Sequence, residues 1–360
     1  MGIKTFKRSD LMGKAQTVLG TIFPESLGII LPHEHLFVDT VSAVNDNKPK
    51  DQSGLELYHQ PVTLENLWWI AYHPASNRDN LLLNNENTAI KEASFFKDAG
   101  GGTIVDASNH YMGRNPAALV RVSRVTGLNI IMGSGYYIAE THPAGMNNKT
   151  EDDIYKEIVR EITVGVEHSD IRAGIIGEIG CSWPMTNNEK KVLRAAAKAQ
   201  LHTGAPLYIH PGRRPIPDSS GPLEIISVLK NAGADISRTV ICHIERTLPK
   251  FDEYLMLVET GCYLEYDTFG WEGYHSNITV DLPNDHYRVN QIMRLIDEGY
   301  LDQILISQDI CWKHRLRKYG GHGYDHILQN AVPLMRAKGM TDEQIYALLV
   351  ENPKRLLQFN

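Results

Sequence analysis

The chain has 360 residues, of which 42% are hydrophobic and 22% are charged, and its formal net charge at pH 7 is -7. This length and apolar content suffice to bury a large core, and scattered basic residues in an acidic chain argue against nucleic-acid binding. No apolar stretch reaches the roughly 20 residues of a membrane-spanning helix, and the polar N-terminus lacks the apolar core of a secretory signal. We therefore expect a cytoplasmic globular protein.

Short apolar runs alternate with longer amphipathic stretches along the chain. Apolar runs of roughly four to eight residues that end at turn residues are typical of strands buried on both faces. We predict eight such strands, at residues 27–31, 102–106, 128–133, 173–180, 206–210, 239–243, 262–267 and 304–309.

The stretches between these strands carry helix signals. Thr186 and Glu189 form a capping-box pattern at the start of one predicted helix, and Gly204 would end it. Strands that alternate with helices predict parallel βα units. Eight units predict an α/β fold of the closed (β/α)8 TIM-barrel type rather than an open sheet. We expect residues 1–360 to form this barrel as a single domain.

Three segments lie outside the eight units. Residues 1–26 are expected to form a short strand or hairpin that closes the bottom of the barrel, and residues 341–358 to form extra C-terminal helices. The insertion at residues 45–85 carries three aromatic residues, Trp68, Trp69 and Tyr72. These side chains would pack either over the mouth of the barrel or against an outer helix.

Residues that commonly bind metal ions end five of the predicted strands. They are His33 and His35, Glu178, His210, His243 and Asp309. Because the C-terminal strand ends of a barrel converge on one mouth, these imidazoles and carboxylates would meet in one cavity. Taken alone, each of these residues could instead have an ordinary structural role, such as a hydrogen bond or a helix cap, and not bind a metal. The joint pattern predicts a site for zinc, manganese, cobalt or iron.

The spacing within the first strand supports this prediction. Alternate residues of a strand point to the same face, so His33 and His35 would point into the barrel and Glu34 away from it. Glu178 is the candidate bridge between two cations about 3.5–4 Å apart. Asp309 could bind one cation and also accept a proton from a water molecule between them.

The strand-end residues resemble the signature of the amidohydrolase superfamily, and the segments around them resemble its phosphotriesterase-like branch. The segments are GKAQTVLG, LPHEHL, GTIVDAS, GSGYY, GIIGEIGCSWP, LYIHPGR, ICHIERT, ISQD and GGHGYDHIL. The resemblance covers nearly the whole chain. It implies two divalent ions, with zinc as the expected metal. The more buried ion would be held by His33, His35 and Asp309, and the more exposed ion by His210 and His243.

Three positions depart from the founding phosphotriesterases. Glu178 stands where they have a carboxylated lysine, and it needs no carbon dioxide to become a carboxylate. Asp267 is followed by Thr268 rather than by a proton-shuttling histidine, and Arg246 replaces a second aspartate after His243. These departures argue against phosphotriester hydrolysis.

Candidate substrate contacts lie on the loops after the strands: Tyr137, Arg213, Arg214 and Arg246. Basic residues on these loops favour an anionic small-molecule substrate. The resemblance implies an amidase that cleaves small anionic N-acyl amino acids, such as N-acetyltaurine, by attack of a metal-activated hydroxide. Asp309 would pass the proton to the leaving amine. A lactonase or esterase, a promiscuous phosphotriesterase, and an inactive metal-binding barrel remain open, as does assembly into a homodimer.

Overall fold

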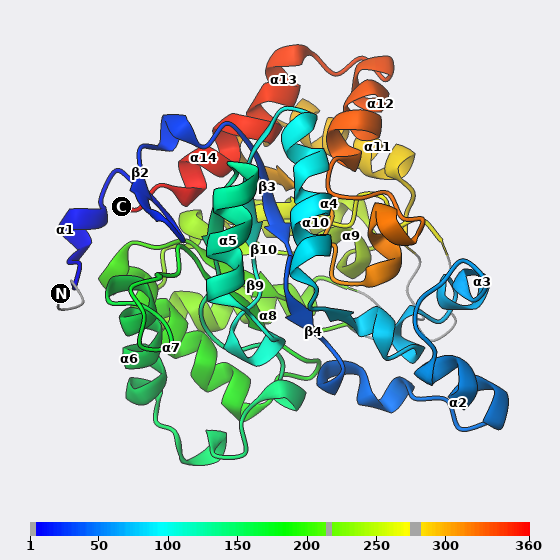
Figure 1. Ribbon diagram of the computed structural model, residues 1–360. Helices are drawn as coiled ribbons and strands as arrows, with labels where there is room; N and C mark the ends of the chain where they lie inside the picture. Colours follow the sequence, from blue (N-terminus) through cyan, green and yellow to red (C-terminus); the bar gives the residue numbers. More distant parts are fainter. Residues whose placement is uncertain (1–4, 214–217, 274–281) are drawn as a thin grey trace.

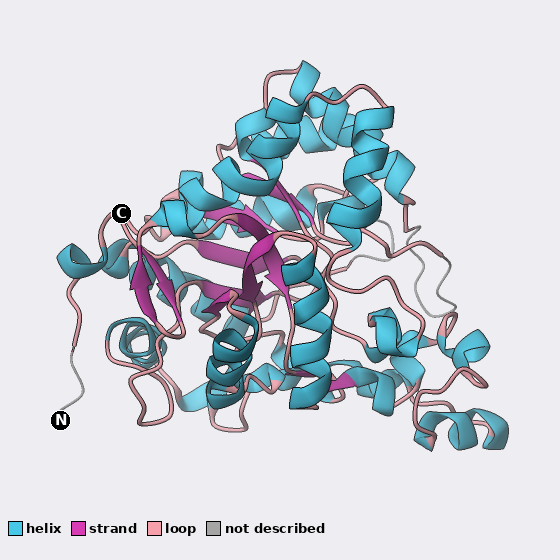
Figure 2. Ribbon diagram, turned by 45° about the horizontal axis from the view of Figure 1, so that its top comes forward, coloured by secondary structure: helices cyan, strands magenta, loops and turns pink. Residues whose placement is uncertain are grey.

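A computed structural model describes residues 5–213, 218–273 and 282–360 of the chain, without the side chains of residues 45 and 46. Strands occupy the centre of the molecule and helices surround them (Figures 1 and 2). The barrel strands correspond one to one with the predicted strands. They are β3 (Ile29–Glu34), β6 (Gly101–Asp106), β7 (Asn129–Met132), β8 (Ile176–Gly180), β9 (Leu207–His210), β10 (Thr239–Ile241), β11 (Tyr263–Tyr266) and β12 (Ile304–Ile306).

Two seams close these strands into a barrel. Within the described residues, β3, β6 and β7 pair in parallel as one sheet, and β8 to β12 pair in parallel as another. At the first seam, the backbone N–H of Gly177 donates to the carbonyl of Ser134 at 2.7 Å. At the second, the backbone N–H of Asp309 donates to the carbonyl of His33 at 3.2 Å. The second seam therefore brings the ends of the first and last barrel strands together.

A helix follows each barrel strand. These helices are α4 (Glu86–Asp98), α5 (Pro116–Thr126), α6 (Glu151–Thr163), α7 (Asn187–Thr203), α8 (Ser220–Asn231), α10 (Phe251–Val258), α11 (Asp285–Asp297) and α12 (Val332–Ala337). The predicted capping box of α7 is confirmed: Thr186 N donates to Glu189 Oε2 at 2.7 Å, and Glu189 N donates to Thr186 Oγ1. Gly204 ends the helix at φ +77°, a conformation that favours glycine.

The barrel is packed on both faces of its strands. A large apolar cluster fills the space between strands and helices. A smaller cluster takes one residue from, or next to, each of the barrel strands: Ile30, Val105, Ile131, Ile175, Tyr208, Val240, Tyr263 and Leu305. This second cluster forms a solid floor beneath the strand ends, as expected of a TIM barrel, whose interior is filled rather than open. The polar residues at the strand ends therefore stand on a rigid base.

The predicted extra segments are present at both ends of the chain. The strands β1 (Ala15–Thr17) and β2 (Gly20–Ile22) form an antiparallel hairpin, and Val18 N donates to the carbonyl of Ile130 at the start of β7. The C-terminal helices are α13 (Asp342–Tyr346) and α14 (Asn352–Leu357). The C-terminal segment lies beside the N-terminal hairpin (Figure 1), where Phe359 N donates to the carbonyl of Lys14 at 2.8 Å.

The insertion after the first strand carries α2 (Gln52–His59) and α3 (Leu67–Ile70), which project to one side of the barrel (Figure 1). Of its three aromatic residues, Trp68 is 67% exposed and Tyr72 is 53% exposed, and Trp69 stacks on His73. None of the three lines the cavity at the barrel mouth, so the structure does not show them in the wall of that cavity. No helix in the described ranges is long and apolar enough to cross a membrane.

Candidate metal centre

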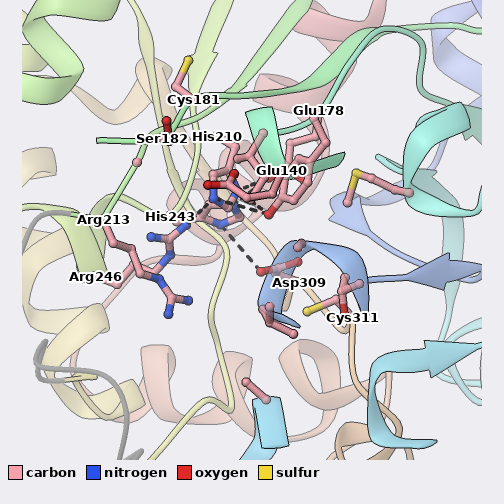
Figure 3. A pocket seen from close by; sticks show the side chains of 18 of the residues that line it. Glu140, Glu178, Cys181, Ser182, His210, Arg213, His243, Arg246, Asp309 and Cys311 are labelled. Atoms are coloured by element: carbon pink, nitrogen blue, oxygen red, sulfur yellow. Dashed lines mark hydrogen bonds and ion pairs between the residues drawn. The ribbon is translucent and has the colours of Figure 1, made fainter. Parts of the chain in front are cut away.

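Six side chains predicted as ligands converge at the C-terminal mouth of the barrel, and Glu178 contacts four of them. Figure 3 shows Glu178, His210, His243 and Asp309. Glu178 Oε1 is 2.6 Å from His210 Nδ1, 2.8 Å from His243 Nε2 and 3.8 Å from His33 Nε2. Glu178 Oε2 is 3.9 Å from His35 Nε2. One carboxylate thus faces imidazoles from β3 on one side and from the ends of β9 and β10 on the other.

Asp309 completes the ring of donors. Its Oδ1 is 3.1 Å from His35 Nε2 and 3.9 Å from His33 Nε2, and its Oδ2 is 3.7 Å from His243 Nδ1. Its side chain is 11% exposed and is the most open of the carboxylates around the centre. This exposure leaves Asp309 accessible to a small molecule in the cavity.

The donor set fits a pair of divalent cations. Donor atoms of His33, His35 and Glu178 lie within 4.8 Å of one another, and so do those of Glu178, His210 and His243. The Nε2 atom of His33 is buried and has no hydrogen-bond partner among the described residues. A buried, unpaired nitrogen is costly unless something binds it, and a cation among these donors would do so. The two clusters share Glu178, as a binuclear site requires.

The backbone is locally strained where two of these side chains enter the centre. His243 has a φ of +54° and Asp309 a φ of +46°. Left-handed backbone at a residue other than glycine costs about 1–3 kcal/mol and persists only where the surroundings fix it. Gly177, just before Glu178, has a φ of +142°, and a Cβ there would lie 2.7 Å from Tyr208. The chain therefore adopts unfavourable geometry to direct these donors inward.

Two further carboxylates, to which the sequence patterns assigned no role at the metal centre, contact the far ring nitrogens of His33 and His243. Asp267 Oδ1 is 2.7 Å from His243 Nδ1, and Asp267 Oδ2 accepts the backbone N–H of His243 at 3.0 Å. Glu265 Oε2 is 2.9 Å from His33 Nδ1. Such contacts leave the opposite nitrogen of each ring for the metal. The sequence does carry a signal for these two contacts, because Glu265 and Asp267 occupy alternate positions of one buried apolar run and therefore point to the same face.

The electrostatics of the centre differ between its two sides, and Glu178, His210 and His243 take the protonation states that bind metal. Burial raises the pKa of Glu178, but the neighbouring His210 and His33 outweigh it and hold that pKa well below its ordinary value. Burial, and then the positive charge of Arg246, lower the pKa of His243 well below its ordinary value. Burial likewise lowers the pKa of His210. An ionised carboxylate beside neutral imidazoles is the form that binds a cation. On the other side, burial is outweighed by Glu265 and Glu178, which raise the pKa of His33 well above its ordinary value, and by Asp309, which raises the pKa of His35. A cation must displace a proton from these two rings to bind there.

A cavity of about 380 Å³ opens above the donors. Arg213 and Arg246 lie on one side of the two central histidines and Asp309 lies on another (Figure 3). Trp271 and Trp312 form an aromatic wall, with ring centroids 4.8 Å apart. The segment just after the first strand contributes Thr40, Ala43 and Val44 to the wall, and the insertion contributes Asn47 and Ala75.

Three of the four predicted substrate contacts line this cavity. Tyr137 lines the cavity with its hydroxyl 3.2 Å from His210 Nδ1. Arg213 lines it at the exposed rim. Arg246 is only 3% exposed. Arg214 lies outside the described residues.

Thr268, which stands where the founding phosphotriesterases have a proton-shuttling histidine, does not line the cavity. Its backbone N–H and its hydroxyl both donate to Glu245 Oε1, at 2.8 and 2.6 Å, and Arg288 Nη2 donates to its hydroxyl at 2.9 Å. This residue is therefore part of a buried ionic network and offers no proton transfer to the cavity.

A (β/α)8 barrel with imidazoles and carboxylates converging at its mouth is an arrangement of metal-dependent hydrolases. Residues 13–357 match the model of the Phosphotriesterase family, and the chain belongs to this family. It is 46% identical over 354 residues to an N-acetyltaurine hydrolase from Danio rerio, an alignment that spans 98% of this chain and 99% of that protein.

Solved structures agree with this assignment. A resiniferatoxin-binding protein from Rhodobacter sphaeroides superposes with a TM-score of 0.92 at 34% identity, covering 99% of this chain and 98% of that one. A lactonase from Listeria monocytogenes superposes with a TM-score of 0.77 at 25% identity, covering 96% and 99%. The chain is a hydrolase with a TIM-barrel fold, and its clustered donors are suited to a binuclear divalent metal site.

Proposed function

We propose that this hydrolase is an amidase that cleaves small N-acyl amino acids with an anionic head group, N-acetyltaurine being the leading candidate. The observation that carries the proposal is Arg246. Its guanidinium is buried in the wall of the cavity, and its Nη1 has no hydrogen-bond partner among the described residues. A buried, unpaired cation beside the reaction centre favours a substrate that brings a negative charge. The N-acetyltaurine hydrolase of Danio rerio supports the same substrate class.

The proposed ligands are the six predicted residues, with zinc as the metal. His33, His35 and Asp309 would hold the more buried ion, His210 and His243 the more exposed one, and Glu178 would bridge them. Bound there, the two ions would polarise the scissile carbonyl and lower the pKa of a water molecule towards neutrality. We further propose that the whole chain acts as one catalytic domain.

The residues of the chain would carry the remaining steps. Water oxygen bonds to the carbonyl carbon, and Asp309, which is open to the cavity, accepts the proton that the water loses. The C–N bond then breaks, and Asp309 returns this proton to the departing amine nitrogen. Arg246 and Arg213 bind the head group on the side of His210 that faces away from the metal centre. This binding holds the amide in place. Tyr137 borders the same position through its hydroxyl.

The substrate class is tested by a hydrolysis comparison. The compounds are N-acetyltaurine, a neutral analogue in which a sulfonamide replaces the sulfonate, a simple lactone and a neutral phosphotriester. We expect the highest kcat/KM for N-acetyltaurine. Arg246→Gln should lower it by roughly ten- to a hundredfold, the effect of losing a charge-assisted hydrogen bond, and should change the neutral analogue much less. A higher kcat/KM for the lactone would identify a lactonase instead, as in the Listeria relative.

A further inference from the structure

The two ring nitrogens of His210 face different surroundings. Nδ1 points into the metal centre, 2.6 Å from Glu178 Oε1 and 3.0 Å from His243 Nε2. Nε2 points away from it, towards Arg246 Nη2 at 3.3 Å. Figure 3 shows the two arginines of the cavity beside these rings. His210 therefore stands between the metal centre and the cationic side of the cavity.

The contact between His210 and Arg246 depends on where the ring proton lies. A neutral imidazole carries one N–H, and its other nitrogen is an acceptor. The guanidinium of Arg246 offers only N–H donors, so it can bond to Nε2 only while the proton is on Nδ1. A cation at Nδ1 uses the lone pair of that nitrogen, which places the proton on Nε2. Two donors then face each other, although the ring stays neutral throughout.

No carboxylate among the described residues pairs with Arg246 to resolve this conflict. Its Nη1 has no partner within the described ranges, and its side chain is buried. The hydroxyl of Tyr137 lies 3.2 Å from Nδ1 and 3.4 Å from Nε2 of His210, and it is the other polar group near Nε2. Tyr137 is uncharged, and burial raises its pKa well above the ordinary value. The space between Arg246 and Nε2 of His210 therefore lacks a negatively charged acceptor.

We propose that Arg246 and Nε2 of His210 form an anion subsite that is completed when a cation binds to Nδ1 of the same ring. The ligand class is a carboxylate, sulfonate or similar oxyanion, whose oxygens accept from both groups. This inference deepens the proposed function, because it couples binding of the substrate head group to binding of the metal. It rests on the proposal that His210 is a metal ligand and does not depend on the amide reaction. Because such coupling is reciprocal, the anion should also tighten metal binding.

The test measures zinc affinity with and without an anion that cannot be hydrolysed. Metal-free protein competes with a fluorescent chelator for zinc, in buffer alone, with methanesulfonate, or with dimethyl sulfone as the neutral control. We expect methanesulfonate to tighten the weaker zinc site by about fivefold or more, within the usual range of coupling between two sites. Dimethyl sulfone should have no effect. Arg246→Gln should abolish the effect, and Arg336→Gln, at an exposed arginine that pairs with Asp342, should preserve it.

Each contrary result has a distinct meaning. Zinc binding at two sites without any effect of methanesulfonate would overturn the coupling but leave the amidase proposal standing. An effect that persists in Arg246→Gln would show that the anion contacts zinc directly, which also overturns the subsite. Failure of zinc to bind would overturn both proposals. If Arg246→Gln does not fold, ¹⁵N-histidine NMR of the zinc-loaded wild-type chain replaces it, with His210→Asn used to assign the signal. A proton on Nδ1 of His210 would then refute the inference.

Discussion

The carboxylate of Glu34 holds the backbone on both sides of Asp309. Glu34 Oε1 accepts the N–H of Gln308 at 2.9 Å, and Glu34 Oε2 accepts the N–H of Ile310 at 3.0 Å. The residue between them, Asp309, is the one with left-handed backbone at φ +46°. Glu34, the middle residue of the first-strand motif, thus points away from the cavity as predicted and positions the donor from the last strand.

Glu34→Gln should destabilise the fold and weaken metal binding. A side-chain amide presents an NH2 group to one of the two backbone N–H groups, which leaves a buried donor unpaired and costs about 1–3 kcal/mol. Urea unfolding measures the loss of stability, and metal content after dialysis measures the loss of binding. Glu92→Gln is the matched control, since Glu92 also accepts two backbone N–H groups, at 2.9 Å from Arg317 and Lys318, away from the site. Equal metal retention in both variants would limit Glu34 to a structural role.

Wild-type protein should bind two divalent ions per chain, and chelation should abolish activity that zinc or manganese then restores. His210→Ala and His243→Ala should each lose the more exposed ion, because each removes one of its two histidine donors. Elemental analysis gives the stoichiometry. His326→Ala, which removes a histidine paired with Asp285 outside the centre, should keep both ions. Full activity in protein with less than one ion per chain would refute the binuclear proposal.

Reconstitution of the metal-free protein should not depend on bicarbonate. A carboxylated lysine needs carbon dioxide to form, whereas Glu178 is already a carboxylate and its pKa is held well below the ordinary value by His210 and His33 against the effect of burial. Glu178→Gln should lose metal, since a neutral amide oxygen bridges two cations poorly. Recovery of activity is followed in bicarbonate-free and bicarbonate-supplemented buffers. Bicarbonate dependence, or a fully active Gln variant, would exclude Glu178 as the bridge.

His322 should make the protein less stable in mild acid. Burial, and then the charges of Arg315 and His326, lower its pKa to about 3 from an ordinary 6.5. Below pH 6.5 the unfolded chain binds a proton that the folded chain does not, so stability falls as the pH falls through this range. Between pH 7 and pH 5 this single group costs about 2 kcal/mol. His322→Gln should remove that part of the pH dependence, measured by urea unfolding. Parallel pH profiles for the variant and the wild type would contradict the assignment.

The sequence determined the barrel architecture and the six predicted metal ligands, because both follow from regular, local patterns. Buried apolar runs separated by capped helices specify βα units, as the Thr186–Glu189 capping box shows. Once eight such units close into a barrel, the strand ends must converge. Residues as distant as His33 and Asp309 could therefore be assigned to one site from their positions at strand ends alone.

Only the tertiary structure decided which residues surround the six ligands. Glu265 and His33, which are in contact, lie 232 positions apart in the sequence. Arg246 approaches His210 just after a left-handed residue, His243, whose conformation no local sequence pattern predicts. The cavity wall likewise takes Asn47 and Ala75 from the insertion rather than its three aromatic residues. Which side chains meet across a barrel depends on strand register and on strained backbone, and both are fixed by long-range packing rather than by the order of the residues.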